Sequence, residues 1–391
     1  MARQSSRVPR TVWVLGFVSL FMDVSSELVH SLLPLFLVVG LGASPAVLGV
    51  IEGIAESTAS VAKLFSGWLS DRLGRRKLLV ALGYGLGAAS KPLFPLATAP
   101  WMVLAARFAD RVGKGVRGAP RDALVADVTP PGLRGAAYGV RQSLDTVGAF
   151  VGPLAAIGLM ALLDGDIRAV LMLAVLPAVI SVVLVVAGVE EPRAGAPRAA
   201  ATPVRWSEAG ALGVAFWGAV GVGVVFTLAR FSEAFLILRG ADLGFSATLA
   251  PLVLVAMNLV YAVAAAPLGG LSDRIGRRPL LAAGLVALVA ADLVLALAPG
   301  PTAVLMGAGL WGLHMALTQG LLSAVVADAA PPRLRGAAFG MFNLATGVAL
   351  LAASTLAGVL WAALGPAATF LAGAAFAAVA GVGLLGLRRR G

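Results

Sequence analysis

The residues that could do chemistry are concentrated in one stretch, RFADRVGKGVRGAPRDALVAD, at 107–127. Eight of its 21 residues are charged. On a helix with about 100° per residue, seven of these charges share one arc of about 140°: Arg107, Asp110, Arg111, Lys114, Arg117, Arg121 and Asp122. Because lipid cannot host such a face, it must line a polar cavity or meet compensating charges. We therefore expect Arg107, Arg111 and Lys114 to bind a solute or to belong to a gating network.

Acidic side chains that could compensate the charge of this basic face lie earlier in the chain. Asp23, Glu27 and His30 share one helical face, and Glu52 and Glu56 share another. A carboxylate buried beside bases can be poised to exchange a proton near working pH. The pattern favours Glu27 as the proton-coupling residue, followed by Asp23, Glu56 and Glu52. The alternative is that these acids are permanently ionised partners that hold the helices together.

No arrangement typical of an enzyme occurs in the sequence. No paired nucleophile and base stands out, the pattern GxxxxGK[ST] is absent, and there is no cysteine. Three groups on one helix, such as Asp23, Glu27 and His30, rarely converge on one metal ion. We therefore expect no enzyme activity, no cofactor and no resident metal, with a metal ion only as an alternative substrate.

The whole composition is that of a membrane protein. Of 391 residues, 59% are hydrophobic and 13% are charged, and the mean hydropathy is +0.94; soluble domains are about a quarter charged. The net charge of +11 does not indicate nucleic-acid binding, because the basic residues fall in alternate short loops and at the termini. The expected partners are a lipid bilayer, a small solute and protons, and we expect a monomer.

Apolar segments separated by Gly, Pro and charge clusters predict an all-α polytopic membrane protein with twelve transmembrane helices. The expected spans are 11–38, 46–70, 77–98, 100–127, 135–162, 167–189, 208–238, 246–271, 279–298, 301–328, 336–363 and 366–387. Loops and termini place 19 basic residues on one side and two, Arg168 and Arg239, on the other. The basic side predicts cytoplasmic termini. We expect the plasma membrane, which in a bacterium is the inner membrane, and no removable signal.

The chain also repeats itself. GWLSDRLGRRKLL at 67–79 recurs as GGLSDRIGRRPLL at 269–281, and ADVTPPGLRGAAYG at 126–139 recurs as ADAAPPRLRGAAFG at 327–340. The repeat predicts six-helix bundles at 1–190 and 208–391, joined by a cytoplasmic linker at 191–207. Two like halves around a central site are common in carriers that work by alternating access.

The repeated loop G-x-L-S-D-R-x-G-R-R closely resembles the signature loop of the major facilitator superfamily. The resemblance implies that fold, and it implies gating roles for Gly67, Asp71, Arg72, Gly74, Arg75, Asp127, Gly269, Asp273, Arg274, Gly276 and Arg277. We expect Gly67 and Gly269 to allow close helix approach and Gly74 and Gly276 to permit a tight turn. Arg76, Lys77 and Arg278 are better explained as topology anchors.

A second pattern lies in the span 135–162. Gly139, Gly148, Gly152 and Pro153 resemble the antiporter motif of proton-coupled drug exporters within that superfamily, although Ala156 stands at the first position of the usual following Gly-Gly. The resemblance implies a gating role for Gly148, Gly152 and Pro153, and export by antiport. The alternative is a glycine-rich packing face.

The polar residues within the spans of the C-terminal half are mostly uncharged. The span 301–328 reads WGLHMALTQGLLSAVVAD where its repeat partner reads DRVGKGVRGAPRDALVAD. Arg230, Glu233 and Asp292 are the charges left within its spans, and the substrate-binding candidates are Asn258, Tyr261, His314 and Gln319, together with His30 in the N-terminal half. A charged half facing an apolar half suits an amphiphilic solute.

These observations predict a secondary active transporter that exports a small amphiphilic or anionic organic solute in exchange for protons. Within the same class, the alternatives are an importer or a carrier of a metal ion or metal chelate. From another class, the alternative is a non-transporting membrane sensor on the same fold.

Overall fold

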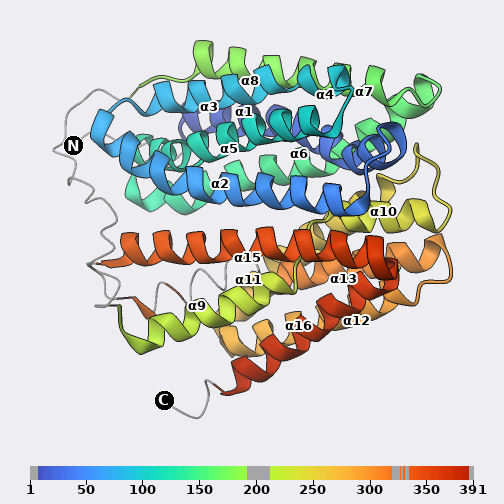
Figure 1. Cartoon of the computed structure of the whole chain (residues 1–391). Helices are drawn as coiled ribbons and strands as arrows, with labels where there is room; N and C mark the ends of the chain where they lie inside the picture. Colours follow the sequence, from blue (N-terminus) through green and yellow to red (C-terminus); the bar gives the residue numbers. More distant parts are fainter. Residues whose placement is uncertain (1–7, 192–211, 319–325, 327–328, 331–333, 387–391) are drawn as a thin grey trace, which may run out of the picture. The chain divides into compact units, whose positions relative to one another are not determined.

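The computed structural model describes residues 8–191, 212–318, 326, 329–330 and 334–386 (Figure 1). Every regular element among these residues is a helix. The predicted all-α class is therefore confirmed.

In the first half the predicted spans and the helices agree closely. Two spans are interrupted near one end, because Lys91 and Pro92 follow the end of α3, and because a turn at Ala174 separates α7 from α8. The helices are α1 (Arg10–Leu35, continued by the π-helix η1, Phe36–Gly40), α2 (Pro45–Leu73), α3 (Arg76–Ser90), α4 (Leu93–Leu96), α5 (Pro100–Val128), α6 (Arg134–Leu162), α7 (Ile167–Leu173) and α8 (Val175–Gly188).

In the second half one span departs clearly from its prediction. The continuous helix expected over 208–238 is wrong, because residues 229–233 are not helical and separate α9 (Gly213–Leu228) from α10 (Ala234–Asp242). The backbone N–H of Ser232 donates to Oγ of Ser354, and the N–H of Ala234 donates to Oγ of Ser232. Side-chain oxygens thus replace helical carbonyl partners at this interruption, which we call the α9–α10 break.

The remaining helices of the second half follow the predicted order. The helix expected from residue 246 begins only at Leu252, after turns at 247–251. The elements are α11 (Leu252–Ile275), α12 (Arg277–Ala296), α13 (Pro301–Thr318), α15 (Arg335–Leu364) and α16 (Pro366–Gly386).

Seven stretches of the described residues are by themselves long and apolar enough to cross a membrane. α2 and α5 are not among them, although each has 29 residues. Both carry several charged side chains, which lower their mean hydropathy. The fold is that of a polytopic membrane protein in which some spanning helices are polar.

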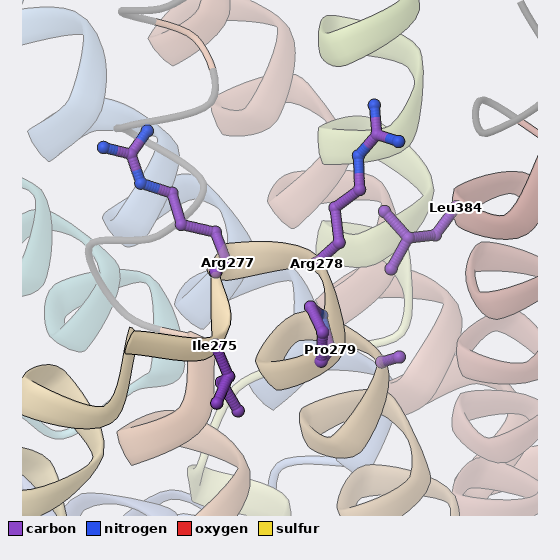
Figure 2. A pocket seen from close by; sticks show the side chains of 7 residues that line it. Ile275, Arg277, Arg278, Pro279 and Leu384 are labelled. Carbon is purple, nitrogen blue, oxygen red and sulfur yellow. The ribbon is translucent and has the colours of Figure 1, made fainter. Parts of the chain in front are cut away.

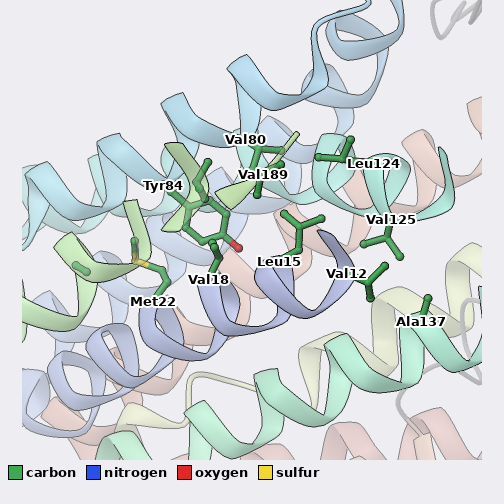
Figure 3. Close-up of a cluster of buried hydrophobic side chains, with 12 residues drawn as sticks. Val12, Leu15, Val18, Met22, Val80, Tyr84, Leu124, Val125, Ala137 and Val189 are labelled. Carbon is green, nitrogen blue, oxygen red and sulfur yellow. The ribbon is translucent and has the colours of Figure 1, made fainter. Parts of the chain in front are cut away.

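The chain forms two compact units. One comprises residues 1–30 and 58–202, and the other comprises 31–57 and 203–391. In the first unit α3 packs against α5 and α8 (Figure 1). Figure 3 shows the apolar core there, where Leu15 and Met22 of α1 lie near Val80 and Tyr84 of α3, with Leu124 of α5 in the same cluster.

The second unit is organised around α12 and α15. α12 packs against α13 and α16, and α15 packs against α9 and α16 (Figure 1). The first part of α2 belongs to this unit and lies close to α15, because a Cβ on Gly53 would lie 2.9 Å from the carbonyl oxygen of Leu351. The predicted halves place all of α2 with the first half, so the compact units divide the chain differently.

Candidate functional site

The charged stretch is a helix, α5, as predicted. It buries Arg107, Asp110, Arg111 and Arg117, whereas Lys114 is exposed. An apolar helix of this length would bury leucine and valine at such positions, so the burial of charge needs neighbours that compensate it.

Glycines let the neighbouring helices approach α5 closely enough to cover these charges. A Cβ on Gly113 would lie 2.7 Å from the carbonyl oxygen of Gly83 on α3. On the other side, a Cβ on Gly115 would lie 2.8 Å from the carbonyl oxygen of Ala59 on α2, and Oγ of Ser66 donates to the Gly115 carbonyl. Gly113 and Gly115 therefore allow α3 and α2 to pack closely on α5.

Asp110 is the centre of the buried charges on α5. Its Oδ1 accepts a hydrogen bond of 2.8 Å from Nζ of Lys91, and its Oδ2 lies 4.0 Å from Nε of Arg111. Arg107 and Arg117 are also within electrostatic reach. Four basic side chains thus surround one carboxylate, and we call Lys91, Arg107, Arg111, Arg117 and Asp110 the basic cluster.

His30 joins the basic cluster through Arg107. Nη2 of Arg107 lies 2.9 Å from Nδ1 of His30, and both side chains are buried. A guanidinium can only donate, so Nδ1 must accept and the ring proton must lie on Nε2. His30 is therefore a neutral acceptor in this arrangement. The structure brings two predicted substrate-binding residues from α1 and α5 together.

The predicted coupling acids of α1 lie against α6. A Cβ on Gly148 would lie 2.9 Å from the Cβ of Asp23, and one on Gly152 would lie 2.7 Å from the Cβ of Glu27. Asp23 is within electrostatic reach of Lys114 and Arg117 and of the acids Glu27 and Asp145. The glycines of the antiporter-like pattern therefore form the surface on which these two carboxylates sit.

A second network of charges lies further along α5 and α6. Arg141 pairs with Asp145 and lies 3.7 Å from Asp122, which also contacts Arg121 at 3.2 Å. Nη1 of Arg121 donates to Oγ of Ser19 on α1. Of these contacts, those between Arg141 and Asp122 and between Arg121 and Ser19 connect different helices, whereas the other two lie within one helix. Arg117 has a further partner, since its guanidinium lies 4.7 Å from the ring centre of Tyr84.

Glu52 and Glu56 belong to the second unit, with the first part of α2. Glu52 is buried, and its Oε2 accepts a hydrogen bond of 3.1 Å from Oγ of Ser232 in the α9–α10 break. Glu56 is half-buried. The sequence offered no sign of the contact between Glu52 and Ser232, because 180 residues separate them.

The candidate binding residues of the C-terminal half are scattered over several helices. Asn258 is buried on α11, and Tyr261 on the same helix is within electrostatic reach of Arg230. Nδ1 of His314 donates to the carbonyl of Gly284, and its ring stacks on Phe226. His314 is therefore held in helix packing, and Gln319 lies outside the described residues.

The two signature loops have the predicted turn geometry. Gly74 and Gly276 have φ values of +65° and +82°, which side chains rarely adopt. The residue after each glycine leads into the next helix. Arg75 precedes the first residue of α3, and Arg277 is the first residue of α12. The two loops thus share a glycine with a positive φ just before the next helix.

Close approach at the first loop is only moderate. A Cβ on Gly67 would lie 3.4 Å from that of Ala119, whereas one on Gly269 meets no described atom within 4 Å. Arg72 is exposed, with its guanidinium 5.4 Å from the ring centre of Trp68, and Arg274 is exposed too. The side chains of Asp71 and Asp273 lie outside the described residues.

Arg76 connects helices, although the sequence favoured a topology anchor. Its Nη1 lies 3.2 Å from Oδ2 of Asp127 at the end of α5, and its backbone N–H donates to Oε1 of Glu191. Lys77 donates from its backbone N–H to Oε2 of the same glutamate. Asp127, predicted as a gating residue, is thus tied to the first signature loop.

A separate cavity of about 650 Å³ lies at the start of α12. Figure 2 shows the side chains of Arg277 and Arg278 extending to one side of the turn, away from that of Ile275. Pro279 and Leu384 also line it. It contains none of the predicted substrate-binding residues.

Comparison with known proteins decides the family. The family model of the Major Facilitator Superfamily matches residues 15–238 and 220–391. The chain belongs to the major facilitator superfamily. This membership makes it a membrane transporter and not an enzyme.

Two relatives that match most of this transporter's length are described as uncharacterized. It is 28% identical over 387 residues to an uncharacterized MFS-type transporter of Methanocaldococcus jannaschii, covering 96% of this chain and 94% of that one. It is 30% identical over 364 residues to an uncharacterized protein of Mycobacterium tuberculosis, covering 90% and 87%. A shorter similarity, 28% over 141 residues, joins it to the multidrug resistance protein MdtH of Edwardsiella ictaluri, covering 36% and 33%.

Solved structures agree on the fold. The crystal structure of peptide transporter POT in complex with sulfate has a TM-score of 0.80 at 16% identity, covering 98% of this chain and 95% of that one. The crystal structure of nucleoside transporter NupG has a TM-score of 0.77 at 14% identity, covering 98% and 100%. At these identities the likeness shows the fold alone.

Proposed function

We propose that this transporter exports a small amphiphilic or anionic organic solute in exchange for protons. The observation that carries the proposal is the basic cluster, in which four bases surround Asp110 on buried helix faces. Basic side chains gathered at one place on a spanning helix can bind the anionic group of a solute, since lipid cannot host them.

Lys114 provides the access that the buried bases lack. It is exposed, and it is within electrostatic reach of Asp23. An anionic headgroup could exchange from Lys114 to Arg111 and Arg107, which lie one and two turns away on the same helix. The helices of the C-terminal half carry few charges, which suits a solute with an apolar body.

Proton coupling is assigned to the acids of α1. Asp23 and Glu27 sit directly on Gly148 and Gly152, so a movement of α6 on α1 changes their surroundings. A carboxylate between bases and a like-charged neighbour is sensitive to such a change. Asp23 has both kinds of neighbour, with Lys114 and Arg117 as bases and Glu27 as the acid.

The direction of transport and the orientation rest on two separate observations. The partial similarity to a multidrug resistance protein favours export, and the excess of basic residues in one set of loops favours cytoplasmic termini. We place the protein in the plasma membrane, as a monomer, with both signature loops facing the cytoplasm.

Inverted membrane vesicles with an acidic lumen test this function. Labelled organic anions and amphiphilic compounds are offered outside, and a compound of the right class should accumulate inside until a protonophore collapses the gradient. Arg107→Gln and Arg111→Gln should lower uptake at least tenfold while the purified proteins remain monodisperse. The proposal is wrong if the active compounds are cations whose uptake both variants retain.

A further inference from the structure

Asp292 is a buried carboxylate that neither the basic cluster nor the coupling acids involve. It lies on α12 with 0% of its surface exposed. Neither Oδ1 nor Oδ2 has a hydrogen-bond partner among the described residues. Buried polar groups in proteins are nearly always paired, so this side chain requires an explanation.

The surroundings of Asp292 are apolar and tightly packed. A Cβ on Gly373 of α16 would lie 2.5 Å from Oδ2 of Asp292 and 3.0 Å from Cε1 of Phe231 in the α9–α10 break. The ring of Phe231 in turn contacts Trp311 and Phe370, with ring centres 5.3 Å and 5.6 Å away. The backbone of Gly373 thus lies close to both the carboxyl group and the Phe231 ring.

The titratable groups on neighbouring elements are engaged elsewhere. On α13, His314 donates to Gly284. In the α9–α10 break, Arg230 is within electrostatic reach of Glu233 and of Tyr261 on α11. The described part of α16 carries no titratable side chain. No base among the described residues is paired with Asp292.

The internal repeat shows how the surroundings of Asp292 differ from the corresponding positions of the N-terminal half. The offset of 202 residues between the signature loops places Asp292 opposite Ser90, which precedes Lys91. The alignment of the two charged-helix sequences places Trp311 opposite Asp110. At these positions the N-terminal half therefore pairs Lys91 with Asp110, whereas the C-terminal half carries Asp292 and Trp311. Among the described residues, Nε1 of Trp311 also lacks a hydrogen-bond partner.

The space and the ligands around Asp292 define what it can bind. The cavity beside its neighbour Gly373, lined also by Phe231 and Thr369 but not by Asp292 itself, measures about 10 Å³, which is about the room that one water needs. The hydroxyl of Thr369 already donates to the carbonyl of Ala357. A metal cation needs several oxygen ligands, and an organic cation needs more room. A proton needs neither.

We propose that Asp292 is a proton-binding site of the C-terminal half. The carboxylate takes one proton from water and is the neutral acid when Phe231 and Gly373 cover it. Phe231 belongs to the non-helical break, so a rearrangement of the break would admit water and allow the proton to leave. This site does not depend on whether Glu27 or Asp23 couples transport.

Infrared spectroscopy tests this site without a transport substrate. The purified full chain in a detergent that lacks carbonyl groups should show a C=O stretching band of a carboxylic acid at neutral pH. In Asp292→Asn the intensity of one acid group should be lost. Asp242→Asn, in the same half, removes an ion-paired and partly exposed carboxylate, and it should leave the acid band unchanged.

A stability measurement keeps the test decisive if Asn is poorly tolerated. A neutral, unpartnered acid can be replaced by a similar apolar side chain at little cost, so Asp292→Leu should melt within a few degrees of wild type. The proposal is overturned if Asp292→Asn keeps the full acid band. It is also overturned if the variant instead loses carboxylate intensity, or if Asp292→Leu and Asp292→Asn both fail to fold.

Discussion

Arg107 of α5 donates a hydrogen bond from Nη2 to Nδ1 of His30 on α1, at 2.9 Å and away from solvent. Because arginine has no acceptor, the contact holds only while His30 is neutral. A second proton on the imidazole would remove the acceptor and place two cations side by side. The pair therefore keeps His30 neutral and orients the guanidinium of Arg107 in the proposed binding site.

Replacing His30 tests whether this contact positions Arg107 for the solute. His30→Asn places an amide oxygen where Nδ1 lies and should bind the solute within about threefold of wild type. His30→Lys puts a fixed cation there and should weaken binding about tenfold or more, which corresponds to about 1.4 kcal/mol. Equilibrium binding of the solute identified in the vesicle screen provides the measurement. Equal affinities in the two variants would contradict the positioning role.

The pair of Lys91 and Asp110 should matter for stability more than a partly exposed pair. Lys91→Met leaves Asp110 without its nearest base and should lower the free energy of unfolding by about 3–5 kcal/mol. Asp110→Asn should cost more, because it removes the acid among four bases. Melting of the purified protein, followed by tryptophan fluorescence, measures both effects.

Asp242→Asn is the control for that series, because Asp242 pairs with Arg239 and its side chain is 43% exposed. Pairs of this kind contribute about 0–1 kcal/mol. If all three variants melt alike, the basic cluster does not depend on its buried carboxylate.

Gly152 should be sensitive to the smallest possible enlargement. In Gly152→Ala the new Cβ would lie 2.7 Å from the Cβ of Glu27, and overpacking of this kind costs about 1–3 kcal/mol. Gly158→Ala on the same helix meets nothing within 4 Å and should be neutral or slightly stabilising. Melting temperatures compare the two variants. A Gly152→Ala protein as stable as Gly158→Ala would show that α6 does not pack closely on the acids of α1.

The orientation can be tested because the chain has no cysteine. Leu73→Cys and Ile275→Cys, beside the two signature loops, should react with an impermeant thiol reagent only after the cells are opened. Leu297→Cys, directly after α12, and Leu162→Cys, at the last residue of α6, lie at the opposite ends of their helices and should react in intact cells. Labelling of the first pair from outside would contradict cytoplasmic signature loops.

Some features of the molecule followed from local pattern and others did not. The extent of α5 was predictable because charges at helical spacing and flanking Gly and Pro residues are properties of nearby residues. The α9–α10 break was not, because ARFSE contains neither Gly nor Pro and its hydrogen bonds come from Ser354 on a distant helix. Which base meets Asp110 likewise depends on helix packing, and only the set of candidate charges was visible in the sequence.

The most direct test of the account is gradient-driven uptake by Glu27→Gln in inverted vesicles with an acidic lumen. Glu27 and Gly152 are in close contact, and a coupling carboxylate must both bind and release a proton, which glutamine cannot do. The account predicts that Glu27→Gln loses uptake driven by the pH gradient and retains counterflow exchange of the solute. If Glu27→Gln, Asp23→Asn and Glu56→Gln each keep full gradient-driven uptake, the assignment of proton coupling to these acids is wrong.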